Sequence, residues 1–335
     1  MGVLASAGII AIVTALGGGV AQADPVPAGP RPLAGVGSET TTPVVNALAN
    51  DATALAIGGV RQVASYNATG SAQITTKDPA VNPNCTIPRP NGSSAGRAAL
   101  IAQWQIAPPS GNDLDKCVQF GRASNLDLSA SPVQLSYLPF ANESISYAIT
   151  RTSFLPSNLT LAQLQGYFRC TNPNPPQGPY RAMLPQSGSG TRSFWITQMY
   201  VGGVLPNPVP ACVQNGVDEN GATIEEHDGR QVNNFEIVPF SVAQWSSQTA
   251  GVIVPDVRGQ TRLGQVNSTN PFSTNFAITR DVYTVIPTTQ EAVAPWSTIF
   301  LGAGAQICNN TSDAIVQRFG LRLSAACGTV AGRTP

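Results

Sequence analysis

Residues 185–195 (PQSGSGTRSFW) combine side chains that suit the binding of a small anion. Glycines alternate with hydroxyl residues, an arginine follows, and an apolar run then continues as a predicted helix. Glycine lets the backbone approach a ligand closely, and the free N–H groups at a helix N-terminus attract negative charge. Ser189, Gly190, Thr191 and Arg192 are therefore candidate ligand-binding residues. A flexible loop followed by an ordinary capped helix would show the same pattern.

Three further loops combine glycine with hydroxyl residues in a similar way. Residues 35–41 (GVGSETT) precede a predicted helix that begins near Pro43, since proline is favoured in a first helical turn. Residues 91–97 (NGSSAGR) precede a predicted helix at 98–104, and residues 120–125 (FGRASN) form a polar turn. The candidate ligand-binding residues in these loops are Ser38, Thr40, Thr41, Ser93, Ser94, Arg122, Ser124 and Asn125.

Each candidate also has a simpler role. The hydroxyls of Ser38, Thr40, Thr41 and Ser94 could do no more than cap the helices that follow. An exposed arginine is usually solvated and has no ligand. Several helix starts that converge on one point make a better anion site than any single loop. Whether the loops converge depends on the strands and helices that lie between them.

Predicted strands and helices alternate between these loops, which indicates an α/β fold with a substantially parallel sheet. In such sheets, ligands bind where the C-terminal ends of strands lead into helices. All four loops are candidates for that position. The strands are predicted at residues 135–140, 145–149, 235–240 and 281–286, and the helices at 159–168 and 242–248.

The composition limits the class of protein. A chain of 335 residues, 42% of them hydrophobic, is long enough for two domains or one large domain with a sizeable core. The formal net charge is zero and only 11% of residues are charged. These values argue against a nucleic-acid-binding protein, which needs a basic face, and against disorder driven by charge.

Residues 3–20 are apolar and precede the sequence AQA at 21–23, which is typical of a signal peptide (residues 1–23) cleaved after Ala23. No lysine or arginine precedes this run, so the usual basic start is missing. A retained membrane anchor is the alternative, although the run is marginal in length for a span. We expect a secreted, periplasmic or cell-surface protein in which residues 24–34 form a flexible leader.

The six cysteines indicate disulfides, because an even number in an exported chain usually pairs. Six cysteines allow fifteen pairings, and sequential pairing is the simplest. It would join Cys85 to Cys117, Cys170 to Cys212, and Cys308 to Cys327. Metal binding is the weaker interpretation, since the chain has no CxxC motif and only one histidine, His227.

Taken together and in this order, the four loops resemble those of the phosphate-binding proteins of ABC transporters, which have the type II periplasmic-binding-protein fold. The resemblance covers about residues 35–287. It implies two lobes, each a mostly parallel sheet flanked by helices, that close on a ligand held between them. It also implies phosphate or a related oxyanion as the ligand, an ABC permease as a partner, and neither an enzymatic reaction nor a cofactor.

The resemblance places residues 35–140 and 249–335 in lobe one and residues 141–248 in lobe two. The chain would cross between the lobes near residues 137–147 and again near 238–244. We expect a monomer that binds no metal and no nucleic acid.

The sequence departs from the family pattern at two positions. The family often has an arginine four residues before the serine of its GSGT loop, where this chain has Pro185, so Arg192 or Arg122 would have to supply the guanidinium. The family also has an aspartate in the third loop that accepts the proton of hydrogen phosphate, where this chain has Asn125. Glu39 is a candidate to replace that carboxylate. Phosphate, another oxyanion and a phosphorylated molecule all remain open as ligands.

Two other functions remain. Residues 92–96 fit the G-x-S-x-G pattern, so a serine hydrolase with Ser94 as nucleophile and His227 as base is one alternative. Its nucleophile turn should follow a buried strand, yet PRPN at 88–91 precedes the motif. A secreted scaffold that keeps the fold without a ligand is the other alternative.

Overall fold

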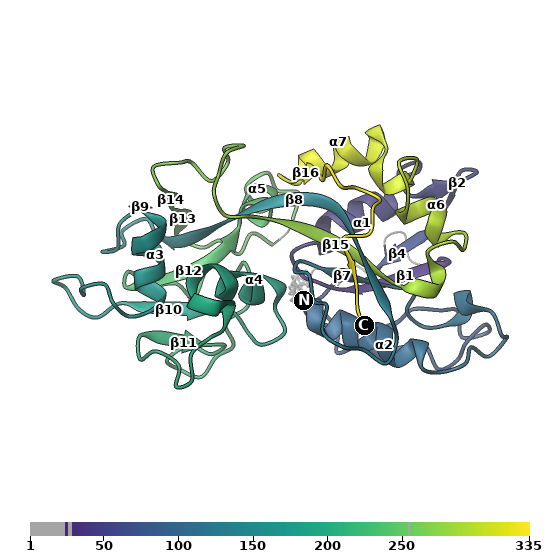
Figure 1. Ribbon diagram of the computed structural model, residues 1–335, viewed down its shortest axis with the longest axis horizontal. Coiled ribbons are helices and arrows are strands. Elements are labelled where there is room, and N and C mark those ends of the chain that lie inside the picture. Colours follow the sequence, from purple (N-terminus) through teal and green to yellow (C-terminus); the bar gives the residue numbers. More distant parts are fainter. Residues whose placement is uncertain (1–23, 26–28, 254) are drawn as a thin grey trace, which may run out of the picture.

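The protein consists of two lobes that lie side by side and are joined by two long antiparallel strands (Figure 1). The computed structural model describes residues 24–25, 29–253 and 255–335, so the predicted signal peptide at 1–23 lies outside the described residues. Within the described part of the chain, no helix combines the length and the apolar character needed to cross a membrane.

The joining strands are β8 (Leu135–Thr150) and β15 (Thr279–Pro287), which pair with each other from Leu135–Pro287 to Ser144–Thr279. At about 3.3 Å per residue, the 16 residues of β8 extend far enough to enter the cores of both lobes. Nearly all of β8 and most of β15 are buried. A strand covered on both faces does not need to alternate apolar and polar residues, as the sequence of β8 shows.

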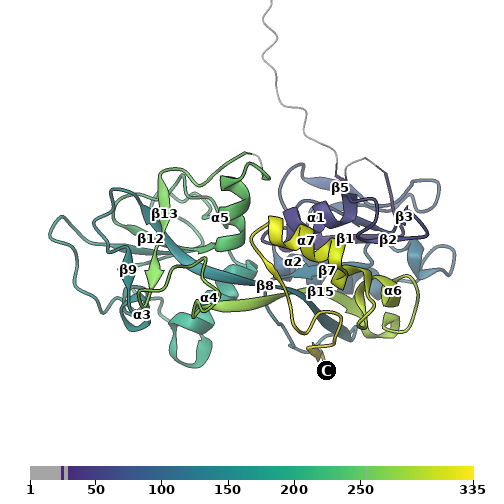
Figure 2. The ribbon, with the colours of Figure 1, turned by 90° about the horizontal axis from the view of Figure 1, so that it is seen from above.

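The sheet of lobe one contains β1 (Leu33–Gly37), which pairs in parallel with β4 (Val63–Ser65) and β7 (Phe120–Ala123). β7 then pairs with β15. The rings of Phe120 and Phe300 lie 5.1 Å apart in the core of this lobe. Figure 2 shows two of its helices, α1 and α7, next to each other. The helices of this lobe are α1 (Thr42–Asn50), α2 (Ser93–Trp104), α6 (Trp296–Phe300) and α7 (Asn310–Arg318).

The sheet of lobe two contains β10 (Arg181–Leu184), which pairs in parallel with β11 (Val213–Asn215) and β12 (Glu236–Ser241). β12 then pairs with β8, so one sheet continues through both lobes. Trp195 is fully buried in the core of this lobe, at the edge of the Phe168 ring. The helices here are α3 (Leu161–Phe168), α4 (Gly190–Met199) and α5 (Val242–Thr249).

The remaining short strands either pair with β8 or form separate two-stranded sheets. In lobe one these are β2 (Ala56–Ile57), β3 (Val60–Arg61), β5 (Gln73–Thr75), β6 (Thr86–Pro88), β16 (Arg322–Leu323) and β17 (Gly332–Arg333). In lobe two they are β9 (Asn158–Leu159), β13 (Thr261–Leu263) and β14 (Gln265–Val266). Of these, β13, β16 and β17 pair with β8.

The predicted two-lobed α/β fold is confirmed, but the structure places the second crossing later than expected. β13 and β14 pair with β8 and β9, and Val266, Phe276 and Ile278 pack in the core of lobe two. Residues 261–278 therefore belong to lobe two rather than lobe one. The chain returns to lobe one through β15, not near residues 238–244, where β12 ends and α5 begins.

The segment predicted to be a flexible leader, residues 24–34, contacts lobe one at both of its described ends. The Arg89 guanidinium and the Asp24 carboxylate form an ion pair of 2.6 Å. Arg31 donates to the carbonyl of Val63 at 2.7 Å, and Leu33 already belongs to β1. These contacts hold the described residues of the segment against lobe one.

The sequential disulfide pairing is confirmed. Each of the three bonds lies within one lobe, so none of them restrains the two lobes relative to each other. The pairs are Cys85–Cys117 and Cys308–Cys327 in lobe one and Cys170–Cys212 in lobe two.

Candidate functional site

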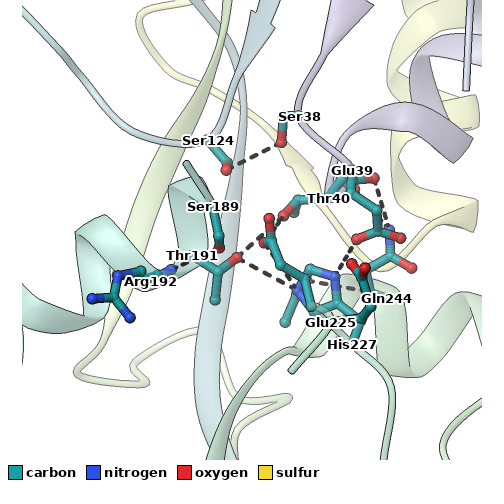
Figure 3. A network of polar contacts seen from close by, with 12 residues as sticks. Ser38, Glu39, Thr40, Ser124, Ser189, Thr191, Arg192, Glu225, His227 and Gln244 are labelled. Atoms are coloured by element: carbon teal, nitrogen blue, oxygen red, sulfur yellow. Dashed lines mark hydrogen bonds and ion pairs between the residues drawn. The ribbon is translucent and has the colours of Figure 1, made fainter. Parts of the chain in front are cut away.

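The four loops meet at the boundary between the lobes. Ser38 follows β1, Ser93 begins α2 and Ser124 follows β7, and all three side chains are buried. The hydroxyl oxygen of Ser124 lies 3.1 Å from that of Ser38, as Figure 3 shows, and 3.3 Å from that of Ser93. The backbone of Gly190, from lobe two, lies against Ser93 and Ser124. The predicted convergence is thus present, with three loops from one lobe and one from the other.

This meeting point gathers helix N-termini. α1, α2 and α4 all begin in the converging loops. Ser189 caps α4 by accepting a hydrogen bond of 2.9 Å from the backbone N–H of Arg192. A Cβ atom on Gly190 would lie 2.2 Å from the Ser124 hydroxyl oxygen, so only glycine allows the start of α4 to approach so closely. The positive ends of these helix dipoles favour negative charge here.

Two threonines carry hydroxyl contacts across the boundary. Thr40 from lobe one and Thr191 from lobe two are both buried, and their hydroxyl oxygens lie 3.2 Å apart. The Thr40 hydroxyl also donates to Glu226 of lobe two at 3.3 Å. Gln244 of α5 donates its side-chain N–H to the Thr40 carbonyl at 3.0 Å. Hydroxyl and amide groups thus hold the two lobes together around Thr40.

The remaining predicted residues of the loops lie at the margin of this site. Thr41 is buried within lobe one, with its hydroxyl 3.5 Å from the Ser38 carbonyl. Asn125 is half-buried beside Gly190. The Ser94 side chain is exposed, and its backbone N–H donates to the carbonyl of Gly188 across the boundary at 3.3 Å.

The arginine that reaches the hydroxyl groups is Arg280 of β15. Its Nη2 donates to the Thr191 hydroxyl at 2.8 Å and lies 3.5 Å from that of Thr40. Its Nε and Nη2 donate to one carboxylate oxygen of Glu143 at 2.8 and 2.6 Å. The Ser241 hydroxyl donates to the other oxygen of Glu143. Nη1 of Arg280 is buried and has no hydrogen-bond partner among the described residues.

Neither predicted arginine takes this position. Arg122 is buried inside lobe one, and its guanidinium donates to carbonyl oxygens of the central strands and to nearby hydroxyls. The Arg192 guanidinium donates to the Pro185 carbonyl at 3.0 Å and points away from Thr40 and His227 in Figure 3. Both guanidinium groups are thus occupied by backbone carbonyls.

His227 links the lobes through a carboxylate. Its Nδ1 lies 2.5 Å from the Glu39 carboxylate, and its Nε2 lies 3.5 Å from the Thr191 hydroxyl and 4.0 Å from Glu226. Only 1% of the His227 side chain is exposed. The hydrolase alternative requires His227 to face Ser94, whereas both of its ring nitrogens face other groups.

The charges around His227 favour its protonated form. Burial alone would lower the pKa of His227, but the charge and hydrogen bond of Glu39, with Glu226 and Glu143, raise it above the ordinary value. Burial raises the pKa of Glu39 even though His227 opposes that shift. The Glu39 carboxylate of lobe one and the Thr191 hydroxyl of lobe two face opposite nitrogens of the His227 ring.

Several of these residues could not be identified from the sequence pattern. Arg280 and Glu143 face each other only because β8 and β15 pair, and that register follows from tertiary structure. Glu226 and His227 lie in a polar stretch with the pattern of an exposed turn, yet both are buried. His227 adopts a positive φ of 60°, which the sequence of a non-glycine residue does not indicate.

Glu39, Glu226 and His227 also place one donor atom each within 4.8 Å of one another, which is close enough to share a metal ion. His227 Nδ1 already contacts the Glu39 carboxylate, so a metal ion would have to displace this contact or bind the other ring nitrogen.

We predict that Gly190→Ala loosens the contact between the lobes. The new methyl group would displace the Ser93 and Ser124 hydroxyls and lower the free energy of unfolding by about 1–3 kcal/mol. The loss should occur even though alanine is intrinsically the better helix former. Gly304→Ala is the control, since a Cβ there meets nothing within 4 Å. Urea unfolding and small-angle scattering measure the effect, and unchanged stability and radius would contradict it.

We also predict that His227 makes stability depend on pH. A pKa raised by folding contributes stability below the ordinary value of about 6.5, and this contribution is lost as the pH rises through the raised value. The free energy of unfolding should therefore fall from pH 6 upward, and His227→Asn should flatten this decline. Urea unfolding over a pH series tests this, because the chain has no other histidine. Parallel curves for the two proteins would contradict it.

Comparison with known proteins supports the fold. No protein-family model matches this chain, and no curated protein matches its sequence. An ABC-type phosphate transport receptor from Vibrio cholerae is 13% identical, with a TM-score of 0.50 over 87% of this chain and 100% of that one. A phosphate-binding protein from Stenotrophomonas maltophilia is 12% identical, with a TM-score of 0.49 over 88% of this chain and 91% of that one. The chain is thus similar to the Vibrio receptor in its two-lobed fold.

Proposed function

We propose that this protein binds a small oxyanion between its two lobes and performs no reaction on it. The observation that carries the proposal is the convergence of four hydroxyl-rich loops and three helix N-termini beside the unpaired Nη1 of Arg280. Ser38, Ser93 and Ser124 form one group of hydroxyls against Gly190, and Thr40 and Thr191 form another across the boundary. These hydroxyls and the N–H groups at the helix starts all favour an anionic oxygen.

Binding would exchange the hydration shell of the anion for fixed protein donors. Backbone N–H groups at the helix starts and the serine and threonine hydroxyls would surround its oxygens, while Arg280 supplies the compensating charge. β8 and β15 would act as the hinge, since they are the strands that join the lobes. Closure excludes water and strengthens every electrostatic contact inside.

We also propose a location and a partner for this protein. The Vibrio receptor with the same fold takes part in ABC-type phosphate transport. We propose that this chain is likewise exported, works outside the cytoplasm and delivers its ligand to an ABC permease. We propose that lobe one comprises residues 29–140 and 281–335 and that lobe two comprises the residues between them, as the hydrophobic cores support.

A ligand-free scaffold of the same fold is a second candidate, favoured by one observation. The hydroxyls of the converging loops already contact one another, as in the pairs Ser38–Ser124 and Thr40–Thr191. These contacts would satisfy the hydrogen-bonding groups of the loops without any ligand.

We predict that removing the Arg280 guanidinium weakens phosphate binding about 10- to 100-fold, since a charged hydrogen bond contributes about 1.5–3 kcal/mol. The test is isothermal titration of wild type and the double variant Arg280→Met/Glu143→Gln with phosphate, arsenate and sulfate. The second change keeps Glu143 from being left as an unpaired buried charge. Arg318→Met on the surface of α7 is the control.

The outcomes separate the two candidates. Binding of at least one oxyanion by wild type and Arg318→Met, with loss in the double variant, supports the proposal. Absence of binding by any of the three oxyanions would favour the scaffold.

A further inference from the structure

The site between the lobes contains more acidic than basic groups. Glu143 is neutralised by Arg280, but Glu39, Glu225 and Glu226 lie nearby without an arginine or lysine ion pair among the described residues. The Glu226 side chain is fully buried, and 23% of the Glu39 side chain is exposed. A positive charge on His227 would balance only one of these three carboxylates.

Two buried polar atoms in this region have no hydrogen-bond partner among the described residues. One is an acceptor, the Oε1 atom of Glu226, and the other is a donor, the Nη1 atom of Arg280. Both groups approach the same hydroxyl, because Thr40 Oγ1 lies 3.3 Å from Glu226 Oε2 and 3.5 Å from Arg280 Nη2. An unpaired acceptor and an unpaired donor therefore flank Thr40.

A buried charge without a partner is costly, and so is a buried polar atom without a hydrogen bond. A simple oxyanion would satisfy Arg280 but would add negative charge beside Glu226. A positively charged donor next to the anion would satisfy Glu226 and reduce the imbalance.

We infer that the ligand is a compact zwitterion in which a phosphonate or phosphate group is joined by a short spacer to a primary ammonium. The oxyanion would lie against the serine hydroxyls, Gly190 and Arg280, and the ammonium would donate to Glu226 Oε1. The inference rests on the proposed function, because it names the ligand of the same site.

Half-buried Glu39 and Glu225 extend this acidic side toward the surface. Glu225 accepts a hydrogen bond of 3.1 Å from the Gln186 side chain, and Glu39 contacts His227. They add negative charge around the ammonium position, and the buried Oε1 of Glu226 has no hydrogen-bond partner among the described residues. The serine hydroxyls with Arg280 therefore match the anionic end of one ligand, and Glu226 with the nearby glutamates matches its ammonium end.

The test compares two ligands of nearly equal size that differ in the ammonium group. Isothermal titration of the full mature protein with 2-aminoethylphosphonate and ethylphosphonate should give affinities that differ at least 10-fold in favour of the amine. Glu226→Gln should reduce this ratio to less than about 3-fold and leave ethylphosphonate binding equal or tighter. Glu39→Gln provides a second variant if Glu226→Gln fails to fold, and it should reduce the ratio at least 2-fold.

Glu219→Gln is the matched control, since Glu219 is exposed and pairs with Arg181. It should keep the wild-type ratio. Equal binding of the two phosphonates by wild type would overturn the zwitterion but leave the oxyanion proposal intact. Binding of neither phosphonate nor phosphate would overturn both. Stabilisation by Zn²⁺ alone, lost in Glu226→Gln, would identify the acidic side as a metal site and overturn the ammonium assignment.

Discussion

The buried ion pair between Glu143 and Arg280 is the interaction on which the site depends. The two residues face each other in the register of β8 and β15, and their side chains are 0% and 3% exposed. Breaking such a pair leaves an uncompensated charge, which costs about 3–5 kcal/mol. The pair therefore fixes the guanidinium on the strands that join the lobes. From there it reaches Thr40 of lobe one and Thr191 of lobe two.

Close backbone approach is the second constraint, and it explains why glycine occurs in the loops. Gly37 and Gly96 touch within lobe one, where a Cβ on Gly96 would lie 2.5 Å from the Gly37 Cα. A Cβ on Gly92 would lie 2.6 Å from the Gly188 carbonyl across the lobes. Helix N-termini can gather at one point only if side chains do not separate them. These glycines let the helix starts, where negative charge is favoured, lie close to one another.

The sequence was sufficient to predict the fold class, the four loops and the disulfide pairing, because each follows from local pattern or simple pairing. It could not identify the arginine of the site. Arg122 and Arg192 adjoin the loops in sequence but bond to backbone carbonyls, whereas Arg280 is brought in by strand register. The burial of Glu226 could not be predicted either, because polar residues in a turn-like segment indicate an exposed position. The second crossing was placed too early because β13 and β14 are too short to show a clear pattern.

If the converging loops and Arg280 hold an oxyanion between the lobes, a crystal structure of the protein grown with phosphate should reveal the anion. We expect tetrahedral density in contact with the Ser38 and Ser93 hydroxyls, the start of α4 and Nη1 of Arg280. Unbroken hydroxyl contacts between Thr40 and Thr191, with no anion at this point in crystals that contain phosphate, would contradict it.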